Sequence, residues 1–92
     1  MVHLRKVAFS ADLFSHYTTS IDLDEVESLK DVIQFVVIDL HRHLEKRNLT
    51  SLCERLKGTN FHTHDYTFEE MLLESNPDRV FYVCGHASND SK

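Results

Sequence analysis

Glycine and proline are scarce in this chain of 92 residues, which contains two glycines and one proline. A phosphate-binding loop needs several glycines to bring the backbone close to the phosphate groups, so this class of site is excluded. The two cysteines, Cys53 and Cys84, are too few for the disulfide framework of a small secreted domain. No positively charged, apolar, cleavable leader opens the sequence. We therefore expect a cytoplasmic chain whose two thiols are reduced and unlinked.

Positive charge and long apolar runs are also in short supply. Fifteen acidic and ten basic residues give a formal net charge of -5. Nucleic-acid binding and docking on anionic lipid both depend on Lys and Arg, so both kinds of partner are disfavoured. The longest near-apolar run, from Val32 to Leu40, contains Gln34 and Asp39 and is too short to cross a bilayer. The composition, 41% hydrophobic and 27% charged, is typical of one soluble globular domain.

The longest regular pattern runs from Asp24 to Leu56. Asp24, with Glu27 three residues later, predicts a helix start, because the two side chains can satisfy the orphan N–H groups there. We expect this helix to end near residues 47–48 and a second, short helix to follow, closed by Gly58 as a left-handed cap. One bent helix over the whole stretch is the alternative. The helix stripe, with apolar residues three or four positions apart, is Val26, Leu29, Ile33, Val36, Leu40 and Leu44.

Three segments have the composition and periodicity of strands. Residues 2–11 form one, with either a bulge near residues 5–6 or a start at Leu4, and residues 16–23 alternate cleanly between apolar and polar. Residues 79–84 carry apolar side chains on both faces of the predicted strand, at odd and at even positions, which is typical of a central strand. We predict an α+β domain in which the long helix packs across a mixed sheet; another two-layer α+β sandwich is the runner-up. The expected core is Val7, Phe9, Tyr17, Ile21, Leu23, Val26, Leu29, Ile33, Val36, Leu40, Leu52, Leu72, Val80 and Tyr82.

Shorter signals lie between the long helix and the last strand. Thr67 and Glu70 have the spacing of a capping box, which predicts a helical turn. Residues 76–78, Asn-Pro-Asp, predict a turn, and residues 59–65 a loop or short strand anchored by Phe61.

This order of elements resembles the ubiquitin-like β-grasp. The most specific likeness is Asp65-Tyr66-Thr67-Phe68, then a helical turn and the strand at 78–83, which look like the Asp-Tyr turn and closing strand of ubiquitin. The hairpin over residues 7–14 resembles that of a flagellar cytoskeletal scaffold, and similar modules stand at the N-termini of larger scaffold proteins. The resemblance implies a single ubiquitin-like domain over residues 1–86, with 87–92 a disordered tail or the start of a linker.

The resemblance does not imply conjugation, because Cys84-Gly85-His86 stands where conjugating members end in Gly-Gly. It implies a non-conjugating protein–protein interaction module of a scaffold or cytoskeletal protein, and no enzyme. Asp39 and His43 are spaced for a hydrogen bond on one helix face, but no Ser or Cys is placed by sequence as their nucleophile. We interpret them as a surface pair.

The resemblance also implies a docking surface, the sheet face opposite the helix, with the closing strand through its middle. Because side chains alternate along a strand, either Phe81 with Val83 points outward, or Tyr82 with its parity mates Val80 and Cys84. We expect the first arrangement, because Cys is usually buried, and a buried Cys84 would place Val80 and Tyr82 on the buried side as well. The neighbours expected on this face are Lys6, His16, Thr18, Ser20 and Arg79. An aromatic rimmed by cations suits an acidic or aromatic-bearing protein segment.

Two alternatives to that docking surface remain. The long helix carries more apolar residues than one sheet face needs, among them Phe35 and Ile38, and these are either covered by residues 49–56 or available to a partner. A small zinc-binding domain is the alternative function, with His62, His64, Cys84 and His86 as candidate ligands. Neither His-Thr-His nor Cys-Gly-His has the spacing of a known zinc motif, so we expect no cofactor.

Overall fold

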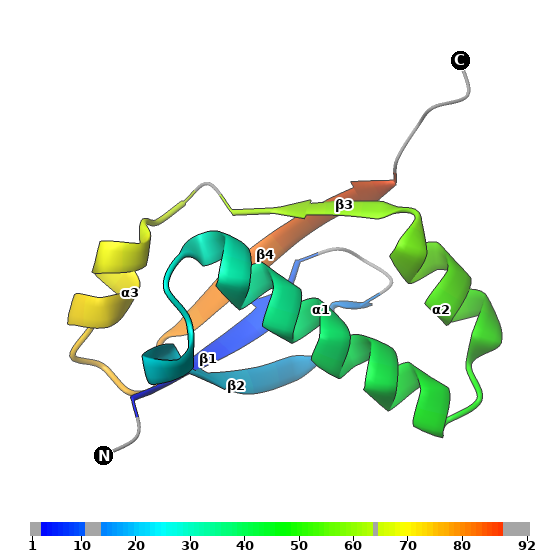
Figure 1. Cartoon of the computed structure of the whole chain (residues 1–92), viewed down its shortest axis with the longest axis horizontal. Helices are drawn as coiled ribbons and strands as arrows, with labels where there is room; N and C mark the ends of the chain where they lie inside the picture. Colours follow the sequence, from blue (N-terminus) through cyan, green and yellow to red (C-terminus); the bar gives the residue numbers. More distant parts are fainter. Residues whose placement is uncertain (1–2, 11–13, 64, 88–92) are drawn as a thin grey trace.

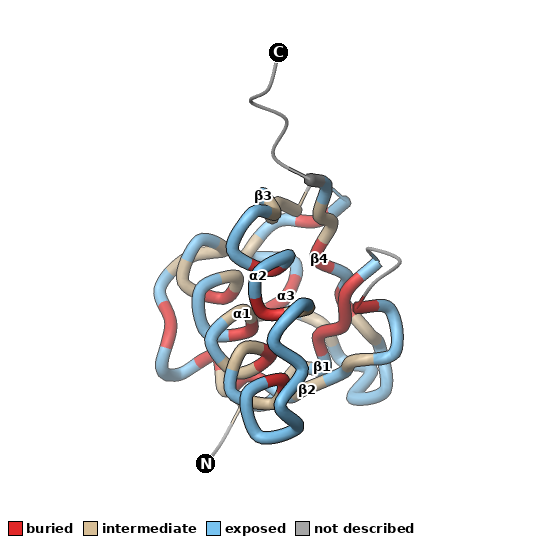
Figure 2. The backbone as a smooth tube through the Cα atoms, turned by 90° about the vertical axis from the view of Figure 1, so that its right-hand side faces the viewer, coloured by how far each residue is buried: buried red, intermediate tan, exposed pale blue. Residues whose placement is uncertain are grey.

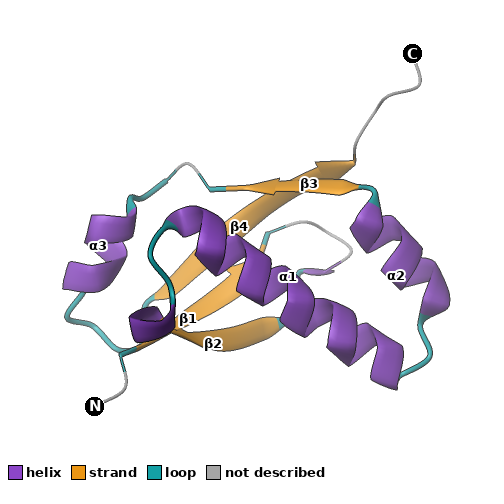
Figure 3. Cartoon of the chain, viewed as in Figure 1, coloured by secondary structure: helices purple, strands orange, loops and turns teal. Residues whose placement is uncertain are grey.

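The computed structural model of the chain describes residues 3–10, 14–63 and 65–87. The fold is α+β, with a four-stranded mixed sheet and one long helix, as predicted. Figures 1 and 3 show the elements in chain order, which are β1 (Leu4–Phe9), β2 (Thr18–Asp22), the 3-10 turn η2 (Leu23–Glu25), α1 (Leu29–Lys46), α2 (Thr50–Lys57), β3 (Thr59–His62), α3 (Phe68–Leu73) and β4 (Val80–Ala87).

The strand order in the sheet is β2-β1-β4-β3. β1 pairs antiparallel with β2 and parallel with β4, and β3 pairs antiparallel with β4. The prediction of a central closing strand is therefore confirmed. β1 begins at Leu4, which was one of its two expected starts. β4 continues through Ala87, one residue into the expected tail, and residues 88–92 lie outside the described part of the chain.

Helix α1 begins four residues later than we predicted, because its cap is Ser28 and not Asp24. Asp24 lies instead in η2, where its N–H donates to Oδ1 of Asp22 over 3.0 Å. The helix cap is Ser28, whose side-chain oxygen accepts the N–H of Asp31 at 3.3 Å. The prediction missed this start because an acidic residue and a serine are equally good caps, and the tight η2 turn lets Leu23 reach the core before the helix opens.

Helix α1 ends where predicted, and α2 is a separate helix. Asn48 has a φ of 58° and donates its N–H to the carbonyl of Glu45 at 3.0 Å, while Leu49 donates to the carbonyl of Leu44 at 3.0 Å. These two hydrogen bonds around a residue in the left-handed conformation form a Schellman motif. Gly58, which we expected to be left-handed, has a φ of −93°. The chain therefore reverses direction at Asn48 and needs no glycine there.

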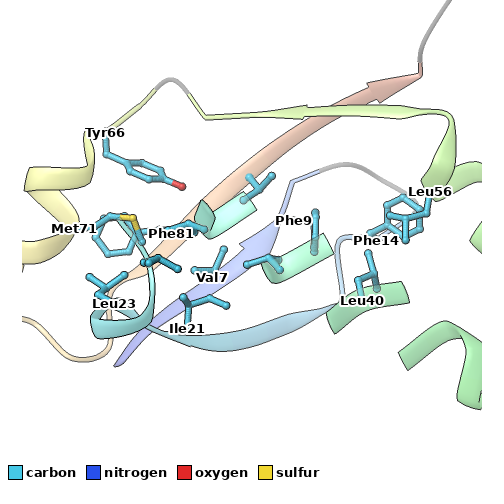
Figure 4. Close-up of a cluster of buried hydrophobic side chains, with 14 of the residues drawn as sticks. Val7, Phe9, Phe14, Ile21, Leu23, Leu40, Leu56, Tyr66, Met71 and Phe81 are labelled. Atoms are coloured by element: carbon cyan, nitrogen blue, oxygen red, sulfur yellow. The ribbon is translucent and has the colours of Figure 1, made fainter. Parts of the chain in front are cut away.

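The core lies between α1 and one face of the sheet, with α2 and α3 closing its ends (Figures 1 and 2). Every fourth residue of α1 faces the sheet, which places Val32, Val36, Leu40 and Leu44 in the core. The predicted Leu29 and Ile33 flank this row and are partly buried. Figure 4 shows other members of the core, which include Val7, Phe9, Phe14, Ile21, Leu23, Leu56, Tyr66, Met71 and Phe81.

Gly85 is expected to be the glycine that the fold cannot replace. It lies opposite Phe61 in the β3–β4 ladder, and a Cβ added to it would stand 2.8 Å from Cε1 of the Phe61 ring. Since Phe61 also packs against Phe9, with ring centroids 5.3 Å apart, the ring has little freedom to move aside. We expect Gly85→Ala to lower the free energy of unfolding, measured in urea, by about 1–3 kcal/mol.

Gly58→Ala is the matched control. A Cβ there meets only two carbonyl oxygens, at 3.8 and 3.9 Å, which is ordinary contact. We expect this variant to be as stable as the natural chain or slightly more stable, because alanine restricts the unfolded state. Equal losses in both variants would contradict the packing of Phe61 over Gly85.

Candidate functional site

The aromatic residue of β4 that points outward is Tyr82, and not Phe81 as we predicted. Phe81 is 1% exposed, Val83 is fully buried, and Tyr82 is 50% exposed. The parallel ladder with β1 is the reason, because Val7 stands opposite Phe81 in that ladder. Residues opposite each other in a ladder face the same side, so Phe81 joins Val7 in the core (Figure 4). The prediction that Phe81 and Val83 point outward is therefore wrong.

The sheet face turned away from α1 is therefore built from the other parity of each strand. Tyr82 is central to it, and Ala8 beside it is buried, because Ala8 lies opposite both Tyr82 on β4 and Thr18 on β2. Leu4, at the start of β1, is 48% exposed. We call this surface the outer sheet face; its residues are Leu4, Lys6, Ala8, Thr18, Ser20, Asn60, His62, Val80, Tyr82, Cys84 and His86. Lys6, Thr18 and Ser20 are exposed on it, as predicted.

The two cations expected at the rim of this face are both paired with carboxylates. Arg79 shares the parity of Phe81, so its guanidinium lies over the Phe81 ring, 4.5 Å from the centroid, and donates to Glu74 at 2.6 Å. That hydrogen bond is the main reason why the pKa of Glu74 is lowered. The placement of Arg79 on the outer sheet face is therefore wrong. Lys6 does lie there, with Nζ 3.4 Å from Oδ1 of Asp78.

His16 lies before β2 and borders a hollow of about 430 Å³ between the start of β2 and the second half of α1. Tyr17 forms part of its wall, and the Tyr17 hydroxyl donates to Asp39. Burial, and then this bond, raise the pKa of Tyr17 to about 12. His43 packs on the Tyr17 ring, with centroids 5.0 Å apart, and its Nδ1 lies 3.4 Å from the guanidinium of Arg47. The Asp39 carboxylate thus orients Tyr17, and His16 faces this hollow.

Three of the four candidate zinc ligands lie on the outer sheet face. His62 stands opposite Cys84 in the β3–β4 ladder, and the rings of His62 and His86 have centroids 5.3 Å apart. His64 lies outside the described residues. Within the described ranges, no three side chains of His, Cys, Asp or Glu gather closely enough to hold a metal ion. No disulfide joins Cys53 and Cys84, as predicted.

Tyr66 supports β4 from the side that faces β3, a role that the sequence did not reveal. Its hydroxyl donates to the carbonyl of Tyr82 at 2.9 Å, and its ring contacts Phe81 edge to face at 4.8 Å between centroids. Burial is the main cause of the raised pKa of Tyr66. Because β3 ends opposite Cys84, Tyr66 takes the place of a neighbouring strand along this part of β4. It thereby fixes the backbone that carries the exposed Tyr82 side chain.

Arg5 is the other supporting residue that sequence reasoning missed. Its guanidinium donates to the carbonyl oxygens of Met71 at 2.7 Å, Leu72 at 3.3 Å and Glu74 at 2.7 Å. These are the orphan carbonyls at the end of α3. The available signal was parity, because Arg5 alternates in step with the buried Val7 and Phe9.

Comparison with known proteins finds no match among protein-family models, curated proteins or solved structures. In the part of the chain that the structure describes, no helix has both the length and the apolarity needed to cross a bilayer. Neither finding assigns a partner to the outer sheet face.

Proposed function

We propose that this chain is a non-conjugating ubiquitin-like module that binds another protein through its outer sheet face. The strand pairings support the β-grasp assignment. An N-terminal hairpin pairs antiparallel, the last strand pairs parallel with the first, and the long helix crosses one face of the sheet. The position of Tyr66 between β3 and α3 agrees with the sequence resemblance. Membership of a larger cytoplasmic scaffold or cytoskeletal protein is part of the proposal and rests on that resemblance alone.

The exposure of Tyr82 is the observation that carries the proposal. Tyrosine is enriched among the few interface residues that supply most of the binding energy, because its ring gives a large contact area at small entropic cost. Tyr82 stands on a rigid central strand that is bonded on both sides, by β1 and by Tyr66. The half-exposed Leu4 and the partly buried Val80 add apolar surface on the same face, and polar residues of β2 and β3 surround it.

The pairing of the nearby charges favours an aromatic or aliphatic partner side chain over an acidic one. Lys6 is already paired with Asp78, and Arg79 is turned toward Glu74. A carboxylate of the partner would have to compete with these intramolecular pairs. An apolar side chain placed on Tyr82 has no such competitor and removes apolar surface from water on both proteins.

Tyr82→Ala is expected to abolish partner capture without unfolding the module. The natural chain and the variant are immobilised and exposed to a lysate of the source cells. The control is Leu73→Ala, which truncates another large exposed side chain; Leu73 is 82% exposed and lies on α3, outside the strands of the sheet. We expect at least one protein to bind the natural chain and Leu73→Ala but not Tyr82→Ala. For that protein in purified form, the affinity falls about 30-fold or more, the loss typical of a hot-spot residue.

The proposal is overturned if every captured protein binds Tyr82→Ala as well as it binds the natural chain. It is also overturned if Leu73→Ala loses the same proteins, because the loss would then not be specific to the outer sheet face. Circular dichroism of both variants verifies that they are folded.

A further inference from the structure

His62 and His86 come together on the outer sheet face although they lie far apart in the sequence. In the β3–β4 ladder His62 stands opposite Cys84, and His86 stands opposite Asn60, so the two histidines are diagonal neighbours. Residues that oppose each other in a ladder, and residues two apart along one strand, share a face of the sheet. The two imidazoles therefore lie on one side of the sheet, with their ring centroids 5.3 Å apart.

The opposite face of these strands fixes where the two histidines stand. Phe61, next to His62, packs against Phe9 of the core, with ring centroids 5.3 Å apart. The Phe61 ring also lies against Gly85, the neighbour of His86, where an added Cβ would stand 2.8 Å from Cε1 of the ring. This packing holds the register of the β3–β4 ladder at the position of both histidines. A site built on paired strands is more precise than one built on loops.

The distance between the two rings matches that of two imidazoles bound to one metal ion. Zinc binds histidine nitrogen at about 2.0–2.1 Å, so two imidazoles in a tetrahedral site have ring centroids roughly 5 Å apart. Imidazole suits zinc and other divalent transition metals, whereas Mg²⁺ and Ca²⁺ prefer oxygen ligands. An anion is disfavoured as the occupant, because the chain has a formal net charge of -5.

We propose that His62 and His86 bind a zinc ion that braces β3 against β4. Among the residues that the structure describes, no third side chain of His, Cys, Asp or Glu stands close enough to complete the site, so water fills the remaining positions of the ion. The ion is therefore held more weakly than in a structural site with four protein ligands. β3 has four residues and pairs only with β4 in the described sheet, so a link between the two strands stabilises their pairing.

Titration of the isotope-labelled chain with zinc chloride tests the site directly. The ring resonances of His62 and His86 are expected to shift together and to saturate at one zinc ion per chain. Mg²⁺ at the same concentration is expected to shift neither ring. Amide exchange in β3 is expected to slow when zinc is bound, because the ion binds the form in which the strands are paired. Zinc shifts that miss either ring, or unchanged exchange in β3, overturn the proposal.

His62→Gln and His86→Gln are each expected to weaken zinc binding about tenfold or more, because each removes one of the two protein ligands. His41→Gln is the matched control. His41 lies beside Glu45 on α1, with Nδ1 3.5 Å from Oε1, and this pair is a competing arrangement of two ligand side chains. We expect His41→Gln to bind zinc as the natural chain does.

Tyr82→Ala is also expected to keep its affinity for zinc, because the site uses neither Tyr82 nor a partner protein. Failure of the zinc site is therefore distinguishable from failure of the proposed docking surface. Circular dichroism verifies that His62→Gln and His86→Gln are folded. Zinc binding that survives in either of these two variants, or that is lost in His41→Gln, overturns the proposal.

Discussion

Phe81→Ala is expected to lower the free energy of unfolding by about 3–5 kcal/mol, the usual cost of removing a fully buried phenylalanine. The Phe81 ring lies in the core beside Val7. The ring of Tyr66 packs against it edge to face, and the guanidinium of Arg79 lies over it. Alanine would leave a cavity that these neighbours cannot fill without giving up contacts elsewhere. Denaturation in urea, followed by circular dichroism, measures the loss.

Tyr82→Ala is the matched control for this prediction, because it truncates an aromatic residue of similar size at the next position of the same strand. Half of the Tyr82 surface is already in water, so we expect a much smaller loss of stability. If the two variants were equally destabilised, or if Tyr82→Ala were the less stable one, the parity of β4 described here would be contradicted.

Arg5→Ala is expected to lower the free energy of unfolding by about 2–3 kcal/mol, because one charged donor group satisfies several carbonyl oxygens at once. The loss should be concentrated at the end of α3, where the guanidinium bonds to Met71, Leu72 and Glu74. The six residues of α3 are too few to form a helix alone, so its attachment to the sheet depends on such contacts. Amide exchange within α3 should therefore accelerate more than exchange within β1 or α1.

Arg5→Lys separates charge from geometry. Lysine keeps the positive charge but cannot present the planar fork that reaches the separate carbonyls, so we expect it to recover only part of the lost stability. Full stability in Arg5→Lys would show that charge alone matters. If amide exchange in α3 were unchanged in Arg5→Ala, the hydrogen bonds from Arg5 would not stabilise α3.

The elements of the fold were largely predictable because each has a local signal. The capping box at Thr67 is present, with both reciprocal hydrogen bonds formed. The Asn-Pro-Asp turn is present as well, with the N–H of Asp78 bonded to the side chain of Asn76. The inward parity of β2, which buries Ile21, followed from its clean alternation. The first helix was misplaced at its start, where several residues could serve as cap.

The parity of β4 was not predictable, because residues 80–84 are apolar at every position and contain no alternation. The parallel ladder with β1 decides it, and a parallel pairing leaves no trace in the local sequence. The errors at Phe81, Val83 and Arg79 all follow from this one choice, since the three residues share a parity. The hollow beside Tyr17 was equally invisible, because it combines residues 14–18 with a part of α1 that lies more than twenty positions further along the chain.

The most direct test of the proposed function is amide chemical-shift mapping. The isotope-labelled chain is titrated with a protein that binds the natural chain but not Tyr82→Ala. We predict that the largest shifts occur on the outer sheet face, at Leu4, Lys6, Val80 and Tyr82, and that the amides of α1 move little. Shifts confined to α1 and the edge of β2 would place the partner on the α1 side of the module and not on the outer sheet face. That result would contradict the assignment of Tyr82 as the docking residue.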